Sequence, residues 1–283
     1  MPASEPRPTL PFLPPRPRDS HKGDFGAVGI LGGAPGMAGA ALLAGRAALA
    51  CGAGRVYLGL LDGRVALDPS TPELMVGSPE RTLALPAPAC LVVGPGLGSH
   101  ADARAWLEAA LGVAHALLLD ADALNLIAGD PDLLARLRQR SAPSLITPHP
   151  GEAGRLLGEA TKAVQADREG ALAGLVARTG AVVVLKGAGT LVQAPGGAPW
   201  RNATGHPGMA APGMGDVLCG LIAALWVQGL TPEDAARTGV WLHGAAGDAA
   251  AARGLGPVGL RASELIVEAR RLLNQAGPVT RHD

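Results

Sequence analysis

The sequence predicts an α/β fold with a central, mostly parallel sheet and helices on both of its faces. From His21 onward, short apolar runs alternate with longer stretches of helical pattern. Such alternation implies right-handed crossovers between parallel strands. Several apolar runs are continuous, as in Leu117-Leu118-Leu119 and Val182-Val183-Val184-Leu185. Continuous runs are typical of strands that helices cover on both sides.

The individual elements follow from this alternation. The runs expected to be strands are Ala27–Leu31, Arg55–Leu60, Cys90–Val93, Ala116–Leu119, Ser144–Thr147, Ala181–Leu185 and Thr190–Val192. The stretches expected to be helices are Met37–Cys51, Ala101–Leu111, Pro131–Arg140, Gly151–Leu157, Ala163–Arg178, Val217–Gln228, Pro232–Ala252 and Ala262–Gln275. Thr231 before Pro232 is a strong helix start, because Thr caps the first amides and Pro suits the first turn.

The N-terminal residues differ from the rest of the chain. Residues 1–20 are rich in proline and show no periodicity, so we expect an extended tail there and a single domain over residues 21–283. Apolar residues make up 48% of the chain but aromatic residues only 2%. The core must therefore consist mostly of Ala, Val and Leu, which suits closely packed layers of helix on sheet.

Composition also excludes several classes of protein. Lys plus Arg and Asp plus Glu each number 24, so we expect no basic face for nucleic acid. No apolar stretch reaches the ~18 residues that suggest a membrane span, and the N-terminus lacks a hydrophobic signal segment. We expect a cytoplasmic protein. Cys51, Cys90 and Cys219 have no metal-ligand spacing and are expected to be buried, reduced thiols.

Ligands of open parallel sheets bind beyond the carboxyl ends of the strands, and two glycine-rich segments fall there. Gly32–Ala40 suggests a dinucleotide site with Asp62 as the ribose acid, but its glycines are spaced G-x-x-G-x-x-G rather than G-x-G-x-x-G. Gly94-Pro95-Gly96-Leu97-Gly98 follows the next strand candidate. In both segments the glycines bring backbone amides close to a ligand or simply make a tight turn.

Two further strand ends carry ionisable side chains. In Thr147-Pro148-His149-Pro150-Gly151-Glu152, two prolines hold an imidazole rigidly at the ligand edge. Glu152 falls in the first turn of the next helix, where a surface acid would complement the dipole. In Lys186-Gly187-Ala188-Gly189-Thr190, a lysine precedes a glycine turn. That lysine either faces phosphate groups or is merely solvated.

The segment Gly213-Met214-Gly215-Asp216 stands before a helix that is apolar on every side. Such a helix is buried and must satisfy its first free amides. Gly213 and Gly215 expose these amides as an anion hole, which the helix dipole assists. Asp216 beside this hole would take a proton from a hydroxyl while the hole steadies a transferring phosphate. The simpler alternative is that Asp216 caps the helix.

Taken in order, these segments resemble the ribokinase-like superfamily and, within it, the ADP/ATP-dependent NAD(P)H-hydrate dehydratases. The matching stretches are Lys22–Gly26, Gly39-Ala40, Gly94–Gly98, Thr147–Glu152, Lys186-Gly187, Asn202–Asp216 and Trp241–Gly244. The Thr147–Glu152 segment discriminates, because the dehydratases carry T-P-H-P-G-E where the related vitamin kinases tend to show T-P-N-x-x-E.

The resemblance implies that the enzyme phosphorylates the ring hydroxyl of hydrated NADH or NADPH with ADP or ATP, after which phosphate leaves. It implies that Asp216 is the base and that the Gly213 and Gly215 amides steady the phosphoryl group. The residues implied for the hydrate are Ala40, Gly96, Gly98, His149 and Asp216, and those for the nucleotide are Lys186, Gly187, Ala188, Gly189, Thr190, Met214 and Gly215. Glu152 would organise Mg²⁺ through water.

The resemblance also leaves questions open. Met214 stands where the family usually has Thr or Ser, and His206 where it usually has Asn. A homotetramer is implied, and the epimerase domain that some relatives carry would be a separate polypeptide. A small-molecule kinase of the hydroxyethylthiazole or hydroxymethylpyrimidine type is the main alternative, and a non-catalytic nucleotide-binding protein is the second. The sequence does not choose between ADP and ATP, or between the two hydrates.

Overall fold

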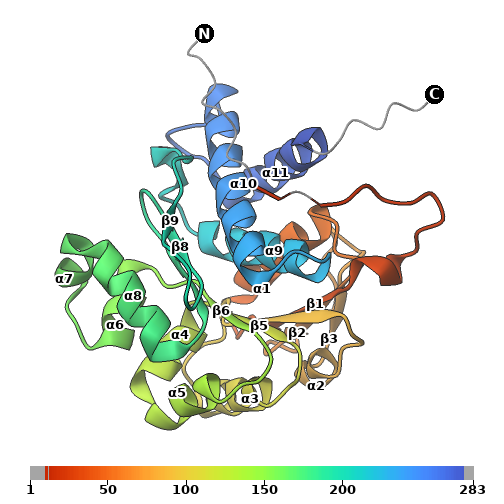
Figure 1. Ribbon diagram of the computed structural model, residues 1–283. Coiled ribbons are helices and arrows are strands. Elements are labelled where there is room, and N and C mark those ends of the chain that lie inside the picture. Colours follow the sequence, from red (N-terminus) through yellow and green to blue (C-terminus); the bar gives the residue numbers. More distant parts are fainter. Residues whose placement is uncertain (1–9, 12, 277–283) are drawn as a thin grey trace.

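A nine-stranded sheet runs through the computed structural model, which describes residues 10–11 and 13–276 (Figure 1). Its order is β3-β2-β1-β4-β5-β6-β7-β8-β9. The strands from β3 to β7 pair in parallel, and β8 and β9 continue the sheet antiparallel. The strands are β1 Ala27–Gly32, β2 Arg55–Leu60, β3 Met75–Gly77, β4 Ala89–Val93, β5 Ala116–Leu119, β6 Ser144–Ile146, β7 Val182–Leu185, β8 Leu191–Gln193 and β9 Trp200–Arg201.

Helices cover both faces of this sheet. They are α1 Ala38–Ala50, α2 Pro79–Leu83, α3 Ala101–Leu111, α4 Asp122–Gly129, α5 Pro131–Arg138, α6 Pro150–Leu157, α7 Thr161–Ala166, α8 Arg168–Thr179, α9 Met214–Val227, α10 Pro232–Ala252 and α11 Ala262–Ala276. Helices α1, α9, α10 and α11 bury one hydrophobic cluster, and α3 to α8 with the opposite face of the sheet bury another. The predicted fold class is therefore confirmed.

The differences from the predicted elements are confined to short segments. Strands β3 and β9 and helix α2 were not expected, because two to five residues carry no readable periodicity. Helix α4 was also missed. The helix predicted over Ala163–Arg178 is divided at Asp167, whose carboxylate accepts a hydrogen bond from the Gly170 amide and so starts α8 as a separate helix.

The described part of the proline-rich segment lies along the domain. Arg16 donates to the Gly52 carbonyl and to the Gln228 side chain, both at 2.7 Å. Its guanidinium also stacks 3.6 Å from the centre of the Phe25 ring. The Thr238 hydroxyl donates to the Pro11 carbonyl at 3.1 Å. Residues 10, 11 and 13–20 contain no helix or strand, and they contact the domain through Pro11 and Arg16. Residues 1–9 and 12 of the predicted tail lie outside the described residues.

The structure also bears on the predictions about the cysteines and about membrane spans. Cys51, Cys90 and Cys219 are all buried and free, as expected. Within residues 10–11 and 13–276, no helix combines the length and apolar character needed to cross a membrane.

Close helix packing fixes α9, the helix that begins at the predicted anion hole. A Cβ on Gly220 would lie 2.1 Å from the Ala44 carbonyl oxygen of α1. A Cβ on Gly239 of α10 would lie 2.6 Å from Ile222 Cγ1 of α9. Because glycine lets the helices approach so closely at these two points, α9 has little freedom to shift against α1 and α10.

This packing predicts a stability difference between two glycines. Gly220→Ala should lower the free energy of unfolding by about 1–3 kcal/mol, since the added methyl group must displace α1. Gly129→Ala at the end of α4 is the matched control, because nothing lies within 4 Å of the added Cβ. Urea denaturation measures both. Equal stability of the two variants would contradict the close approach of α1 and α9.

Candidate active site

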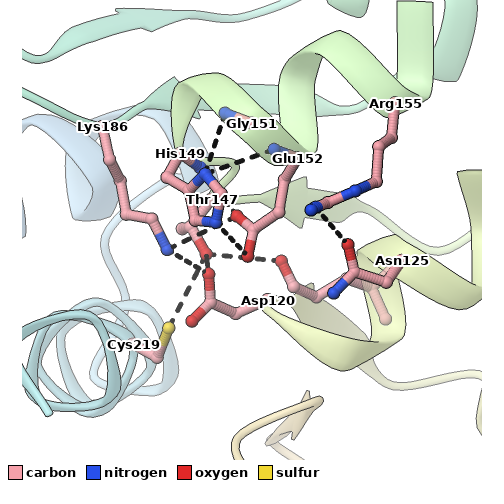
Figure 2. A network of polar contacts seen from close by, with 10 residues as sticks. Asp120, Asn125, Thr147, His149, Gly151, Glu152, Arg155, Lys186 and Cys219 are labelled. Atoms are coloured by element: carbon pink, nitrogen blue, oxygen red, sulfur yellow. Dashed lines mark hydrogen bonds and ion pairs between the residues drawn. The ribbon is translucent and has the colours of Figure 1, made fainter. Parts of the chain in front are cut away.

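Three neighbouring strands end in polar side chains that meet at one point. Asp120 follows β5, Thr147 follows β6 and Lys186 follows β7. One carboxylate oxygen of Asp120 accepts hydrogen bonds from Lys186 Nζ at 2.6 Å and from Thr147 Oγ1 at 2.7 Å. Figure 2 shows these side chains converging, with Cys219 of α9 approaching Thr147 at 3.6 Å between Sγ and Oγ1.

The ion pair between Asp120 and Lys186 is buried. Only 2% of the Asp120 side chain and 18% of the Lys186 side chain are exposed. Burial by itself would raise the pKa of Asp120 and lower that of Lys186. The charges around each group outweigh burial, the partner's charge first among them, so the pKa of Asp120 is lowered and that of Lys186 is raised. Lys186 is therefore a fixed cation, and the alternative of a merely solvated lysine is wrong.

This cation lies against the first turn of α9. Helix α9 begins at Met214 after Gly213, which has φ 85° and thus requires a residue without a Cβ. A Cβ on Gly215 would lie 3.3 Å from Lys186 Nζ and 3.6 Å from Asp120 Oδ2. The ammonium and the positive end of the helix dipole therefore reinforce each other, and the Asp120 carboxylate balances them.

Asp216 lies in the first turn of α9 but does not cap it. Gly213 occupies the cap position, and no side-chain hydrogen bond caps the helix. Burial raises the pKa of Asp216 to about 7, the Asp120 and Asp122 charges add to this, and Lys186 opposes it. A carboxylate that is half ionised near neutral pH is suited to general-base catalysis.

His149 and Glu152 form a capping box at the start of α6. The His149 Nδ1 accepts hydrogen bonds from the amides of Gly151 at 2.9 Å and Glu152 at 3.2 Å. Glu152 Oε2 accepts in turn from the His149 amide at 2.7 Å. Burial and then the Lys186 charge lower the pKa of His149, so its imidazole is neutral and carries its proton on Nε2.

Glu152 is not the surface acid that its place in the first turn suggested. Only 4% of its side chain is exposed, and Oε2 lies 3.8 Å from Lys186 Nζ. Burial raises the pKa of Glu152. This carboxylate therefore belongs to the same buried cluster as Asp120 and Lys186.

The two glycine-rich loops pack against each other. The Ala34 amide donates to the Gly96 carbonyl at 2.7 Å, and a Cβ on Gly96 would lie 2.6 Å from the Met37 carbonyl and 3.3 Å from Ala40 Cβ. The Gly98 amide donates to Asp122 Oδ2 at 2.8 Å. Close approach of the loops thus explains the glycine at 96, and the same contacts bring Ala40 next to the loop Gly94–Gly98.

The residues predicted for the nucleotide line one cavity. It has a volume of about 660 Å³ and lies between the ends of β7 and β8 and helices α9 and α10. Its walls include the whole segment Lys186–Thr190 together with Met214 and Gly215. The cavity therefore ends at the buried ion pair and the start of α9.

Sequence reasoning missed Asp120 and Asp122. A readable signal existed, because Asp120-Ala121-Asp122 directly follows the predicted strand Ala116–Leu119 at the ligand edge of the sheet. Ala121 has φ 49° and is the one non-glycine residue with positive φ in the described part of the chain. Such strain clusters at functional sites. Here the strained residue lies between Asp120 and Asp122.

The fold and this site define a member of the ribokinase-like superfamily. A crystal structure of the ADP/ATP-dependent NAD(P)H-hydrate dehydratase of Bacillus subtilis, co-crystallised with ATP and Mg²⁺, superposes with a TM-score of 0.80 at 28% identity, covering 94% of this chain and 99% of that one. The NAD(P)H-hydrate dehydratase family profile matches residues 28–269. The chain belongs to the NAD(P)H-hydrate dehydratase family.

Similar proteins with named activities support the same family assignment. The chain is 41% identical to the ADP-dependent (S)-NAD(P)H-hydrate dehydratase of Neisseria meningitidis serogroup B over 92% of this chain and 89% of the relative. It is 42% identical to the bifunctional NAD(P)H-hydrate repair enzyme of Escherichia coli K12 over 96% of this chain. The chain spans about half of that bifunctional relative, 52% of its length.

The site geometry predicts how Asp120 controls Asp216. Asp120→Asn removes a charge that raises the pKa of Asp216 and leaves the opposing Lys186 charge unbalanced, so this pKa should fall below its value of about 7. Carbon-13 NMR titration of aspartate carboxyl groups measures the shift. Asp122→Asn should act in the same direction by less, and the exposed control Asp132→Asn should have no effect. An unchanged Asp216 pKa in both site variants would contradict this electrostatic coupling.

Proposed function

We propose that this protein converts hydrated NADH or NADPH, the S epimer, back to the reduced dinucleotide at the expense of ADP or ATP. The observation that carries this proposal is the position of Asp216. Its carboxylate has a pKa of about 7 and belongs to the first turn of α9, whose residues Met214 and Gly215 line the cavity that contains Lys186–Thr190. The activity named for the N. meningitidis relative supports the same reaction.

The chemistry assigns one task to each group. Asp216 takes the proton of the ring hydroxyl, whose oxygen then attacks the terminal phosphoryl group of the donor. The amides of Gly213 and Gly215 and the Lys186 ammonium stabilise the negative charge of the transferring group. Phosphate then leaves with the carbon–oxygen electron pair, the ring nitrogen supplies electrons, and a proton from the adjacent carbon is lost as the double bond forms. ADP yields AMP and phosphate.

His149, Ala40, Gly96 and Gly98 would hold the hydrate on the other side of Asp216. The capping box fixes the His149 ring, and half of this side chain remains exposed. Its Nε2 lies 3.3 Å from Glu152 Oε1, so the imidazole would meet the ligand through the exposed part of its ring. Ala40 and Gly96 lie against each other and Gly98 is tied to Asp122, so these loops form a rigid surface beside the base.

Mg²⁺ would enter with the donor phosphates, whose charge it neutralises. In the described residues no group of three or more His, Cys, Asp and Glu side chains is placed to hold a metal. That fits a cation held mainly by phosphate oxygens and water, since Mg²⁺ commonly keeps several waters. Glu152 is the residue we propose as an acceptor for those waters.

Met214 and His206 depart from the family pattern, but the backbone arrangement at both positions is kept. Met214 is the first residue of α9, and its side chain is buried. Its amide is therefore retained at the anion hole, although a hydroxyl is lost. His206 Nδ1 accepts a hydrogen bond from the Gly208 amide at 3.1 Å. It thus starts the short helix Pro207–Met209 as an Asn side chain would.

Asp216→Asn tests the proposed base. Turnover of hydrated NADH with Mg²⁺ and ADP or ATP, followed by recovery of dihydronicotinamide absorbance, should fall by about 10²–10⁴-fold, because the variant cannot accept the proton. Nucleotide binding, measured by calorimetry, should persist. The exposed control Asp132→Asn should keep full turnover. A wild-type protein that recovers no absorbance with either donor would overturn the dehydratase, and stable phosphorylated product would favour the kinase alternative.

The pKa of Asp216 also predicts the pH dependence. The base must be ionised, so kcat/KM should rise with pH through a midpoint of about 7 and level off above it. Initial rates at low hydrate concentration and saturating nucleotide measure this profile. A midpoint near the ordinary aspartate value of about 4 would contradict Asp216 as the base.

The homotetramer stays a prediction from the family resemblance, and the cytoplasmic location stays a prediction from the sequence. The choice between NADH hydrate and NADPH hydrate is left to the same turnover assay.

A further inference from the structure

The elimination step of the proposed reaction releases a proton that needs an acceptor. Phosphate departs with the carbon–oxygen electron pair, and the ring nitrogen forms a double bond to the carbon that carried it. The adjacent ring carbon must then lose a proton, so that the electrons of its carbon–hydrogen bond form the carbon–carbon double bond and the nitrogen recovers its pair. Asp216 holds the hydroxyl proton after the first step, so it is not the acceptor for this second proton.

Three other ionisable groups near Asp216 are already engaged. Neutral His149 uses the lone pair of Nδ1 for the amides of Gly151 and Glu152, and its other nitrogen carries the proton. The Glu152 side chain is 4% exposed, and that of Asp120 is 2% exposed and paired with Lys186. Carboxylates so enclosed by protein are poorly placed to meet a hydrogen of a bound ring.

Asp122 has the accessibility and the free oxygen that those groups lack. It is the first residue of α4 and is half-buried. Its Oδ2 accepts from the Gly98 amide at 2.8 Å. Among the described residues, no hydrogen bond or ion pair engages its Oδ1. One oxygen therefore fixes the carboxylate in place, and the other keeps its lone pairs for a proton.

The position of Asp122 relates it to both parts of the hydrate site. The hydrogen bond from the Gly98 amide ties it to a loop that we assign to the hydrate, and its charge helps to raise the pKa of Asp216. Ala121, with φ 49°, stands between it and the buried Asp120. At this turn the chain gives one carboxylate to Lys186 and the other to the Gly98 loop.

We propose that Asp122 is a second catalytic base, which takes the proton of the adjacent ring carbon as phosphate leaves. The half-buried side chain then returns the proton to water. This inference rests on the proposed function and deepens it, because it assigns the elimination step to a residue other than the one that starts phosphoryl transfer.

Asp122→Asn separates the two steps. The side-chain oxygen of Asn can still accept from the Gly98 amide, but this group takes up no proton. A single turnover, with enzyme in excess over hydrated NADH and with ADP and Mg²⁺ present, is sampled at intervals. AMP reports phosphoryl transfer, and dihydronicotinamide absorbance reports elimination. Asp132→Asn is the matched control, because Asp132 lies in the first turn of α5 as Asp122 lies in that of α4, but is exposed.

We expect the rate constant for the appearance of absorbance to fall by about 10²–10⁴-fold in Asp122→Asn, because general-base assistance is lost. The rate constant for AMP formation should change little, so phosphorylated hydrate should accumulate and be visible by phosphorus-31 NMR. Asp132→Asn should match the wild type in both rates. Asp122→Ser, which also lacks a carboxylate, should show the same separation of the two rates.

Two results would overturn the second base. Absorbance that follows AMP at the wild-type rate in both Asp122 variants would mean that the departing phosphate or water removes the proton. Equal losses of AMP and absorbance in a folded variant would mean that Asp122 serves phosphoryl transfer instead. Circular dichroism and calorimetric binding of ADP establish that a variant is folded, and Asp122→Ser decides if Asp122→Asn is not.

Failure of the proposed function has a different signature, because it is seen in the wild type. A wild type that forms neither AMP nor absorbance is not a dehydratase, and one that forms AMP and a stable phosphorylated hydrate is a kinase. In both cases the second base falls with the proposed function. A wild type that completes both steps, with Asp122 variants that complete them equally fast, overturns the second base alone.

Discussion

The ion pair between Asp120 and Lys186 is the interaction on which the rest of the site depends. Both groups are buried, so neither is tolerable without the other. The pair joins the ends of β5 and β7 and places a fixed ammonium against the first turn of α9. The same carboxylate helps to raise the pKa of Asp216 to about 7. One buried contact therefore places a positive charge against the first turn of α9 and, through Asp120, helps to raise the pKa of Asp216.

That arrangement requires α9 to lie very close to its neighbours. Gly215 leaves room for the Lys186 ammonium, and Gly220 lets α9 meet α1 at the backbone. The low aromatic content and the abundance of Ala, Val and Leu have the same consequence, because small side chains allow short distances between layers. The small side chains of the core and the close approach of α9 to Lys186 and α1 are thus required together.

Two cavities, of about 660 and 810 Å³, lie at one edge of the sheet, and Lys186 of this pair lines the first of them. On one side lie the segment Lys186–Thr190 and the start of α9, and on the other lie the packed glycine loops and Asp62. A transfer between two large ligands needs such a division, since each must reach the reacting centre without occupying the place of the other.

The sequence by itself determined the parallel sheet and most of its helices, and it predicted the anion hole and Asp216 as the candidate base. Local patterns predict these features: continuous apolar runs, helical periodicity, and glycines before an apolar helix. It did not reveal β3, β9 or α2, which are too short to show a period. The family resemblance depended on local motifs of the same kind.

Only the tertiary structure decided what surrounds those motifs. Lys186 lies 66 positions after Asp120 in the chain, and no pattern around either residue predicts their ion pair. The raised pKa of Asp216 depends on burial and on charges from two other strand ends and loops, which folding alone brings together. The sequence predicted that two prolines hold the His149 imidazole, and the structure adds that the amides of Gly151 and Glu152 donate hydrogen bonds to Nδ1, which makes His149 a helix cap. Local chemistry can be read along the chain, but electrostatic environment is a property of distances in space.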